Sequence, residues 1–87
     1  MIKLLKFYSE TCGPCKRMAP IIEEAMKDFP DVKVVEIDVG KGGLAKAREL
    51  GIRALTTFVI EVDGMVKDMR LGEHSVDDIK KFIAGGK

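Results

Sequence analysis

The order of apolar runs along this chain predicts an α/β fold with a four-stranded mixed sheet and helices on both faces. In the first half, a strand, a helix and a strand follow one another, which implies a right-handed crossover and a parallel strand pair. In the second half, Asp63-Gly64 separates two apolar runs, which is typical of an antiparallel hairpin. The predicted order is βαβαββα, in one domain over residues 1–87.

The first strand and the first helix are predicted from the spacing of apolar residues. Ile2–Tyr8 is apolar on both faces, as expected of a central strand that is covered on both sides. A helix is predicted from Gly13 to about Phe29, because apolar residues recur there at helical spacing. These apolar positions are Met18, Ile21, Ile22, Ala25, Met26 and Phe29.

The middle of the chain predicts a strand and a short helix joined by glycines. Val32–Val39 is rich in valine and forms the second predicted strand. Residues 40–43 are expected to form a flexible turn because three of the four are glycine. A helix over Leu44–Leu50 is expected to end at Gly51.

The last third predicts the hairpin and a closing helix. Thr57–Val62 and Met65–Leu71 are expected to pair as antiparallel strands. Ser75 is a helix cap, with Asp78 three residues later as in a capping box. Residues 85–87 are interpreted as a frayed tail.

Composition excludes several classes of function. Hydrophobic residues make up 46% and charged residues 33% of the 87 positions, a balance that argues against disorder. The net charge is only +1 and basic residues alternate with acidic ones, so we expect no nucleic-acid partner. No apolar stretch approaches the roughly 20 residues that span a bilayer, and we expect no membrane association. Without a recognisable export signal or disulfide framework, the expected location is the cytoplasm.

The two cysteines, Cys12 and Cys15, have C-x-x-C spacing at the start of the predicted first helix. A thiolate is needed to attack a disulfide, and the unpaired N–H groups of a helix N-terminus stabilise Cys12 as an anion. Pro14 suits a first helical turn because its ring presets φ. The expected chemistry is attack by Cys12, a mixed disulfide, and resolution by Cys15.

Structural interpretations of the cysteine pair are weaker. A structural zinc site takes four ligands, and the chain adds only His74 and carboxylates to the two cysteines. A disulfide that closes so short a loop adds little stability. We interpret His74 as a solvated surface residue and the methionines as core residues.

Phe7–Pro20, with Cys12-Gly13-Pro14-Cys15 at its centre, resembles the active-site block of thioredoxins. Gly51–Phe58 is similar to the second signature segment of that family, and Asp63-Gly64 with Gly72 fits its terminal hairpin and glycine. The resemblance covers nearly the whole chain. It implies a thioredoxin-like fold in a minimal form, without the additional N-terminal strand and helix of full-length thioredoxins.

The resemblance also implies a thiol–disulfide oxidoreductase that reduces protein disulfides, with Cys12 as nucleophile and Cys15 as resolving cysteine. Gly13 and Pro14 would form the active-site turn. The implied substrate groove consists of Thr11, Leu55, Thr56 and Gly72. Electrons would come from a thioredoxin-reductase-like partner or another thiol. The expected protein is a monomer whose redox-active disulfide is its only cofactor.

The chain departs from the family pattern in three respects, which involve four positions. Thr11 stands in place of the usual tryptophan, which implies narrower or weaker substrate recognition. Lys6 replaces a buried aspartate that assists proton transfer, and Val34 replaces the lysine partner of that aspartate. A buried Lys6 is costly unless it is neutralised or reaches solvent. If it lies near the thiols, its charge favours the thiolate.

The third departure is Thr56, at the position of the family's cis-proline. A cis bond before a residue other than proline costs about 3–4 kcal/mol, so we predict a trans Leu55–Thr56 bond unless packing forces otherwise. The Thr56 hydroxyl is a candidate hydrogen-bond donor to Cys12 sulfur or to substrate backbone. Because the family's proline is thought to exclude metals, its loss makes an iron–sulfur cluster shared by two chains an alternative cofactor.

Three alternative functions stay open. Tyr8-Ser9 and Thr11-Cys12 have a glutaredoxin-like character, which suggests a glutathione-linked enzyme. Against it, Glu10 stands where a basic residue would help to hold glutathione, and Gly72-Glu73 lacks the expected paired glycines. The second alternative is a metal- or cluster-binding module, and the third is an interaction domain with incidental redox chemistry.

Overall fold

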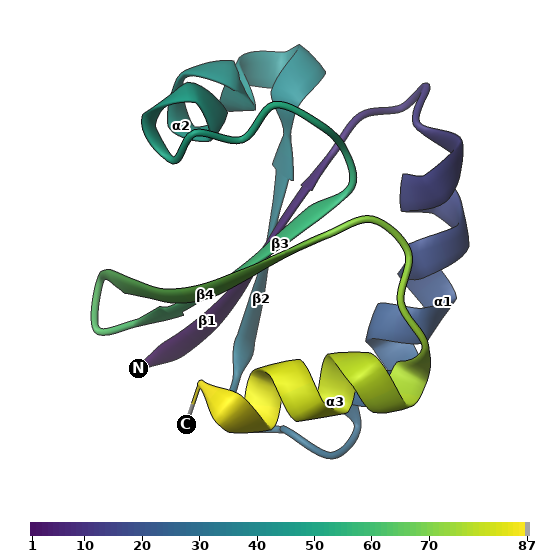
Figure 1. The fold of residues 1–87 in the computed structure, drawn as a ribbon, viewed down its shortest axis with the longest axis vertical. Helices are drawn as coiled ribbons and strands as arrows, with labels where there is room; N and C mark the ends of the chain where they lie inside the picture. Colours follow the sequence, from purple (N-terminus) through teal and green to yellow (C-terminus); the bar gives the residue numbers. More distant parts are fainter. Residues whose placement is uncertain (87) are drawn as a thin grey trace.

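The computed structural model describes residues 1–86 and confirms the predicted order of elements (Figure 1). One segment, η1, is an irregular turn with non-helical backbone at Lys41 and Gly42. The elements are β1 (Ile2–Tyr8), α1 (Gly13–Met26), β2 (Lys33–Asp38), η1 (Val39–Gly43), α2 (Leu44–Glu49), β3 (Thr57–Val62), β4 (Met65–Leu71) and α3 (Val76–Gly85).

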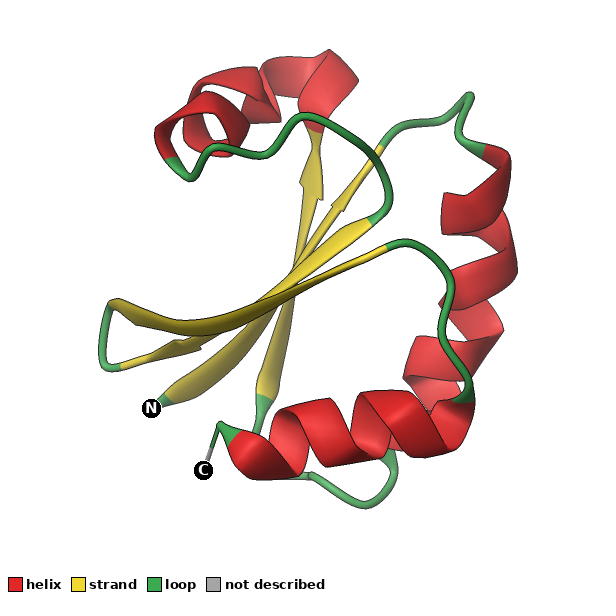
Figure 2. Ribbon diagram, viewed as in Figure 1, coloured by secondary structure: helices red, strands yellow, loops and turns green. Residues whose placement is uncertain are grey.

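The sheet has four strands in the order β2-β1-β3-β4 (Figure 2). β1 runs parallel to β2 and antiparallel to β3, and β3 pairs with β4 across the predicted hairpin. The mixed sheet predicted from the sequence is therefore confirmed. β1 is central, and its carboxyl end leads directly into the turn before α1.

Successive residues of a strand point to opposite faces of the sheet, and β1 shows this alternation in its core contacts. Leu4 packs with residues of α1 and α3, whereas Leu5 and Phe7 pack with Ala47 of α2. Helices α1 and α3 thus cover one face and α2 covers the other, as predicted. The buried core of the α1/α3 face is Leu4, Met18, Ile22, Ala25, Val32, Phe58, Ile60, Ile79, Phe82 and Ile83.

The structure differs from the predictions mainly at the ends of helices. α1 ends at Met26, not at about Phe29, and turns at Lys27 and Asp28 replace the last predicted helical residues. The glycine-rich residues 40–43 belong to the irregular turn η1, where a Cβ on Gly43 would lie 2.8 Å from the Asp38 carbonyl oxygen. Gly86 is buried rather than frayed, since its backbone lies against Ile60. Lys87 of the predicted tail lies outside the described residues.

Candidate active site

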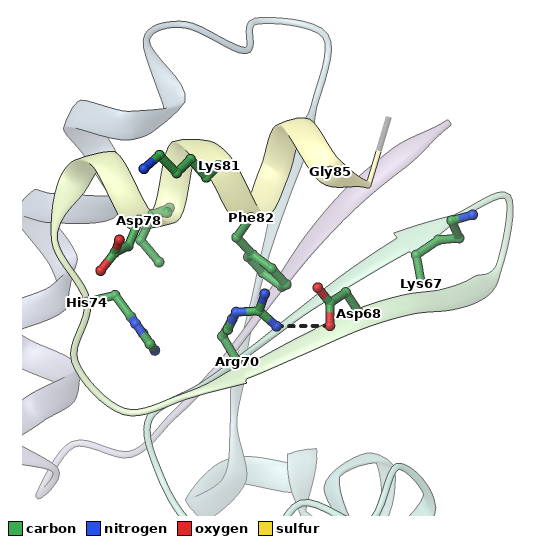
Figure 3. Close-up of a pocket in the computed structure, with 9 residues that line it drawn as sticks. Lys67, Asp68, Arg70, His74, Asp78, Lys81, Phe82 and Gly85 are labelled. Carbon is green, nitrogen blue, oxygen red and sulfur yellow. Dashed lines mark hydrogen bonds and ion pairs between the residues drawn. The ribbon is translucent and has the colours of Figure 1, made fainter.

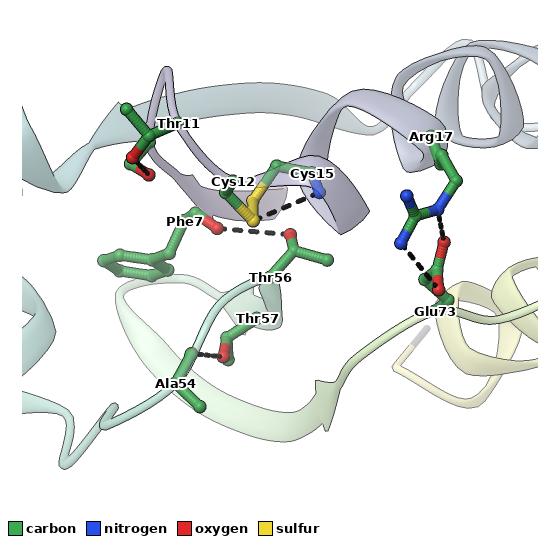
Figure 4. The surroundings of a disulfide bond; sticks show 10 residues. Phe7, Thr11, Cys12, Cys15, Arg17, Ala54, Thr56, Thr57 and Glu73 are labelled. Atoms are coloured by element: carbon green, nitrogen blue, oxygen red, sulfur yellow. Dashed lines mark hydrogen bonds and ion pairs between the residues drawn. A yellow bond between two sulfur atoms is a disulfide. The ribbon is translucent and has the colours of Figure 1, made fainter.

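The two cysteines form a disulfide at the N-terminus of α1 (Figure 4). Cys12 is the N-cap residue, with extended backbone, and its sulfur accepts a hydrogen bond from the Cys15 N–H at 3.2 Å. Their Cα atoms are 5.3 Å apart. Gly13 and Pro14 begin the helix, where the missing N–H of proline costs no helical hydrogen bond. The predicted active-site turn therefore stands at a helix N-terminus.

The two sulfurs have unequal surroundings. Cys12 is half-buried, whereas Cys15 is only 3% exposed. The turn before them is held by a hydrogen bond from the Cys12 N–H to the Ser9 carbonyl oxygen at 3.2 Å. Thr11 is exposed beside this turn and lies 3.4 Å from the Ser9 hydroxyl, oxygen to oxygen. A partner molecule thus meets Cys12 and Thr11 before it can reach Cys15.

Thr56 lies beside the disulfide in Figure 4 and is completely buried. The Leu55–Thr56 peptide bond is cis, so the prediction of a trans bond is wrong. The Thr56 hydroxyl donates to the Phe7 carbonyl oxygen at 3.2 Å and not to Cys12 sulfur, and the Gly72 N–H donates to the Thr56 carbonyl oxygen at 2.8 Å. The local cost of the bond favours the trans form. The burial of Thr56 and its contacts with β1 and with the end of β4 depend on the tertiary structure and are not visible in the sequence.

Lys6 is buried, with an exposed fraction of 6%. Its ammonium lies 3.7 Å from the carboxylate of Glu36, whose side chain is 59% exposed, and 5.7 Å from the centre of the Tyr8 ring. The sequence left open whether a buried Lys6 is neutralised or reaches solvent, and the structure shows an ion pair with Glu36. Lys6 also lines a cavity of about 430 Å³ together with Cys15.

An ion pair that the sequence analysis missed connects α1 to the segment after Gly72. Arg17 donates to both carboxylate oxygens of Glu73, at 2.5 and 3.3 Å. The hydrogen bond from Arg17 holds the pKa of the Glu73 carboxyl below its usual range, and the Arg17 pKa is raised correspondingly. Because the two residues are 56 positions apart, no local pattern identifies the pair.

A second cavity, of about 350 Å³, lies between β4 and α3 (Figure 3). Arg70 lies over the Phe82 ring there and pairs with Asp68. His74, interpreted from the sequence as a solvated surface residue, is half-buried and lines this cavity, with its Nε2 3.0 Å from the Leu71 carbonyl oxygen. Neither cysteine borders this cavity, which is therefore separate from the disulfide site.

Within residues 1–86, no three histidine, cysteine, aspartate or glutamate side chains are grouped closely enough to hold a metal ion. No helix in that range has the length and apolar character required to cross a membrane.

Comparison with known proteins gives concordant results for sequence and structure. Residues 1–85 match the protein family described as Thioredoxin. The chain is 36% identical over 81 residues to a thioredoxin of Rickettsia prowazekii, covering 92% of this chain and 76% of that protein. It is 32% identical over 80 residues to a thioredoxin of Mycoplasmoides gallisepticum, covering 92% and 79%.

Two solved structures show the same arrangement of helices and strands. Oxidised mitochondrial thioredoxin 3 of Saccharomyces cerevisiae superimposes with a TM-score of 0.87 at 31% identity, covering 97% of this chain and 77% of that one. Thioredoxin of Fasciola hepatica gives a TM-score of 0.88 at 28% identity, covering 99% and 81%.

Proposed function

Because this chain belongs to the thioredoxin family and is a dithiol–disulfide oxidoreductase, we propose that Cys12 attacks protein disulfides and that Cys15 resolves the product. The observation that carries this assignment of roles is the unequal exposure of the two sulfurs. Cys12 is half-buried at the helix N-terminus, and Cys15 is almost completely buried one turn later. The accessible sulfur is the one that a protein substrate can reach.

The helix N-terminus supplies the electrostatic reason for attack by Cys12. Cys12 occupies the N-cap, and the Cys15 N–H already points at its sulfur in the disulfide form. In the dithiol form the same N–H and the helix dipole stabilise a Cys12 thiolate. A thiolate at this position is the reacting form in disulfide exchange.

The reaction proceeds in two balanced exchanges. Cys12 thiolate attacks one sulfur of the substrate disulfide, forming a Cys12–substrate bond and releasing the other substrate sulfur as a thiolate. Cys15 thiolate then attacks Cys12 sulfur, forming the Cys12–Cys15 disulfide and releasing the second substrate sulfur. The substrate gains two electrons and the protein loses two. The released thiolates take protons from solvent.

We propose the partners by the same chemistry. Thioredoxins act on protein disulfides and are reduced by thiol donors. For this chain we propose a thioredoxin-reductase-like donor, a monomeric state and a reducing cytoplasmic setting. The cysteine pair itself carries the electrons, so the proposed reaction uses no other cofactor. No observation favours the glutathione-linked, metal-binding or interaction-domain alternatives.

Substitution of each cysteine by serine tests the assignment. With Cys15→Ser, the second exchange is blocked, so mixed disulfides with Cys12 should accumulate when the reduced protein meets a disulfide-bonded protein. Cys12→Ser, the matched control, should form few adducts because Cys15 is buried. Adducts are counted by mass spectrometry of non-reduced samples. Adducts that form mainly on Cys15 would reverse the assignment.

A further inference from the structure

Lys6 is a buried cation on the same side of the sheet as the reactive helix. Side chains alternate along a strand, so Lys6 shares its face with Leu4, which packs beneath α1 and α3. The side chain of Lys6 is 8% exposed. A buried charge is costly unless it is compensated, and its effect on neighbouring groups exceeds that of a charge in water.

The cavity next to Lys6 connects this cation to Cys15. Both residues line the cavity of about 430 Å³, together with Tyr8 and Lys16. A further cavity, of about 310 Å³, is lined by Lys6, Glu23 and Glu36. Lys6 borders both cavities, and its ammonium lies 3.7 Å from the carboxylate of Glu36.

The charged groups around Lys6 offset its positive charge only in part, so Lys6 still acts on Cys15 as a cation. The complete set of titratable groups that line the two cavities with Lys6 is Tyr8, Glu10, Cys15, Lys16, Glu23 and Glu36. Glu10 pairs with Lys41 at 2.6 Å, and Glu36 at 3.7 Å from Lys6 is largely exposed. An exposed carboxylate is screened by water and salt and offsets a buried ammonium only in part.

We propose that Lys6 is a positioning residue that keeps reduced Cys15 in its thiolate form, ready for the resolving step. This proposal rests on the function proposed above. A buried thiol that shares a cavity with a buried cation loses its proton more readily, because the cation stabilises the anion. Lys6 thereby offsets the burial of Cys15, which by itself disfavours the thiolate.

Two consequences follow from this role. Cys15 thiolate attacks Cys12 sulfur of the mixed disulfide, so a larger thiolate fraction speeds resolution without any base that removes a proton. Stabilising the thiolate also favours the reduced protein, because the disulfide carries no charge for Lys6 to stabilise. The reduction potential with Lys6 present is therefore less negative than it is without that charge.

The direct test measures the ionisation of Cys15 alone. In a Cys12→Ser background, the rate of Cys15 alkylation is followed from pH 5 to pH 10 with and without Lys6→Met, at low and high salt. We expect Lys6→Met to raise the pH of half-maximal alkylation by about one unit, roughly a tenfold loss of thiolate near neutral pH. Lys6→Arg keeps the positive charge, so its midpoint should lie close to that of the protein with Lys6. The shift should persist in salt because Lys6 is buried.

Matched variants separate this role from a structural one. Lys16→Gln removes an exposed cation from the same cavity and should give a smaller shift that salt abolishes. Glu36→Gln removes the counter-charge and should move the midpoint downward, a result that stays informative if Lys6→Met fails to fold. An unchanged midpoint in folded Lys6→Met, or in Glu36→Gln at low salt, would overturn the proposal. Adduct trapping by Cys15→Ser with Lys6 intact tests the proposed function independently.

Discussion

The two faces of the sheet are packed by different means. Among residues 1–86, the face under α1 and α3 holds ten buried apolar residues in one cluster. The face under α2 holds four, and α2 itself has six residues and no side-chain cap at its N-terminus. α3 is capped by Ser75, as predicted, through a hydrogen bond from the Asp78 N–H at 3.1 Å. The disulfide therefore lies at the N-terminus of a helix that packs on the larger of the two apolar clusters.

The largest expected effect is on the α1 face, at Met18. This residue is completely buried, and its sulfur also accepts a hydrogen bond from the His74 N–H at 3.4 Å. Met18→Ala should lower the free energy of unfolding by about 2–5 kcal/mol, because it leaves a cavity beneath the reactive helix. Urea denaturation followed by circular dichroism measures the change.

Leu50→Ala is the matched truncation on the α2 face. Leu50 is only half-buried at the edge of the smaller cluster, so the expected loss is nearer to 1 kcal/mol. If Leu50→Ala cost as much as Met18→Ala, the contrast between the two faces would be wrong.

Gly43→Ala tests whether close packing of the Gly43 backbone against Ile37 and Asp38 is needed on the α2 side of the sheet. A Cβ at this position would lie 2.4 Å from the Ile37 side chain and 2.8 Å from the Asp38 carbonyl oxygen. We expect a loss of about 1–3 kcal/mol from overpacking. Gly85→Ala is the control: a Cβ there meets nothing within 4 Å, so alanine in α3 should stabilise by about 0.5–1 kcal/mol. Thermal denaturation measures the stability of both variants. A Gly43→Ala protein more stable than the natural protein would contradict the structure.

Thr56→Val tests the hydrogen bond that connects Thr56, next to the disulfide, to strand β1. It keeps the shape of the side chain but removes the hydroxyl that donates to the Phe7 carbonyl oxygen. The expected cost is about 1 kcal/mol, the usual net value of one hydrogen bond. Thr11→Val makes the same chemical change at an exposed site and should leave stability almost unaltered. Equal effects of the two variants in urea titrations would show that the Thr56 contact adds nothing.

The smallest expected effect is that of the exposed Arg17–Glu73 pair, which connects α1 to the segment before α3. The hydrogen bond from Arg17 lowers the pKa of Glu73 in the folded protein from the usual value of 4.5. The pair therefore stabilises the fold above about pH 4.5, and that contribution disappears as the pH falls through the lowered pKa. Melting temperatures of the natural protein and Glu73→Gln should differ slightly at pH 7 and converge near pH 3. A difference that persists at pH 3 would contradict this account.

Most of the fold was predictable because its signals are local. The apolar run of β1, the helix start at Cys12-Gly13-Pro14-Cys15 and the Asp63-Gly64 turn each depend on a few neighbouring residues. The end of α1 and the burial of Gly86 were not predicted. Contacts with other elements decide where a helix ends and whether the residues after it are buried.

The sequence by itself determined the order of the elements, the position of the cysteine pair at a helix N-terminus and the cap at Ser75. Only the tertiary structure decided the burial of Lys6 at a cavity that Cys15 also lines, the cis bond before Thr56 and the pairing of Arg17 with Glu73. The physical reason is distance along the chain. Caps, turns and periodicity act over a few residues, whereas these contacts join residues that meet only after the sheet has brought β1, α1 and the end of β4 together.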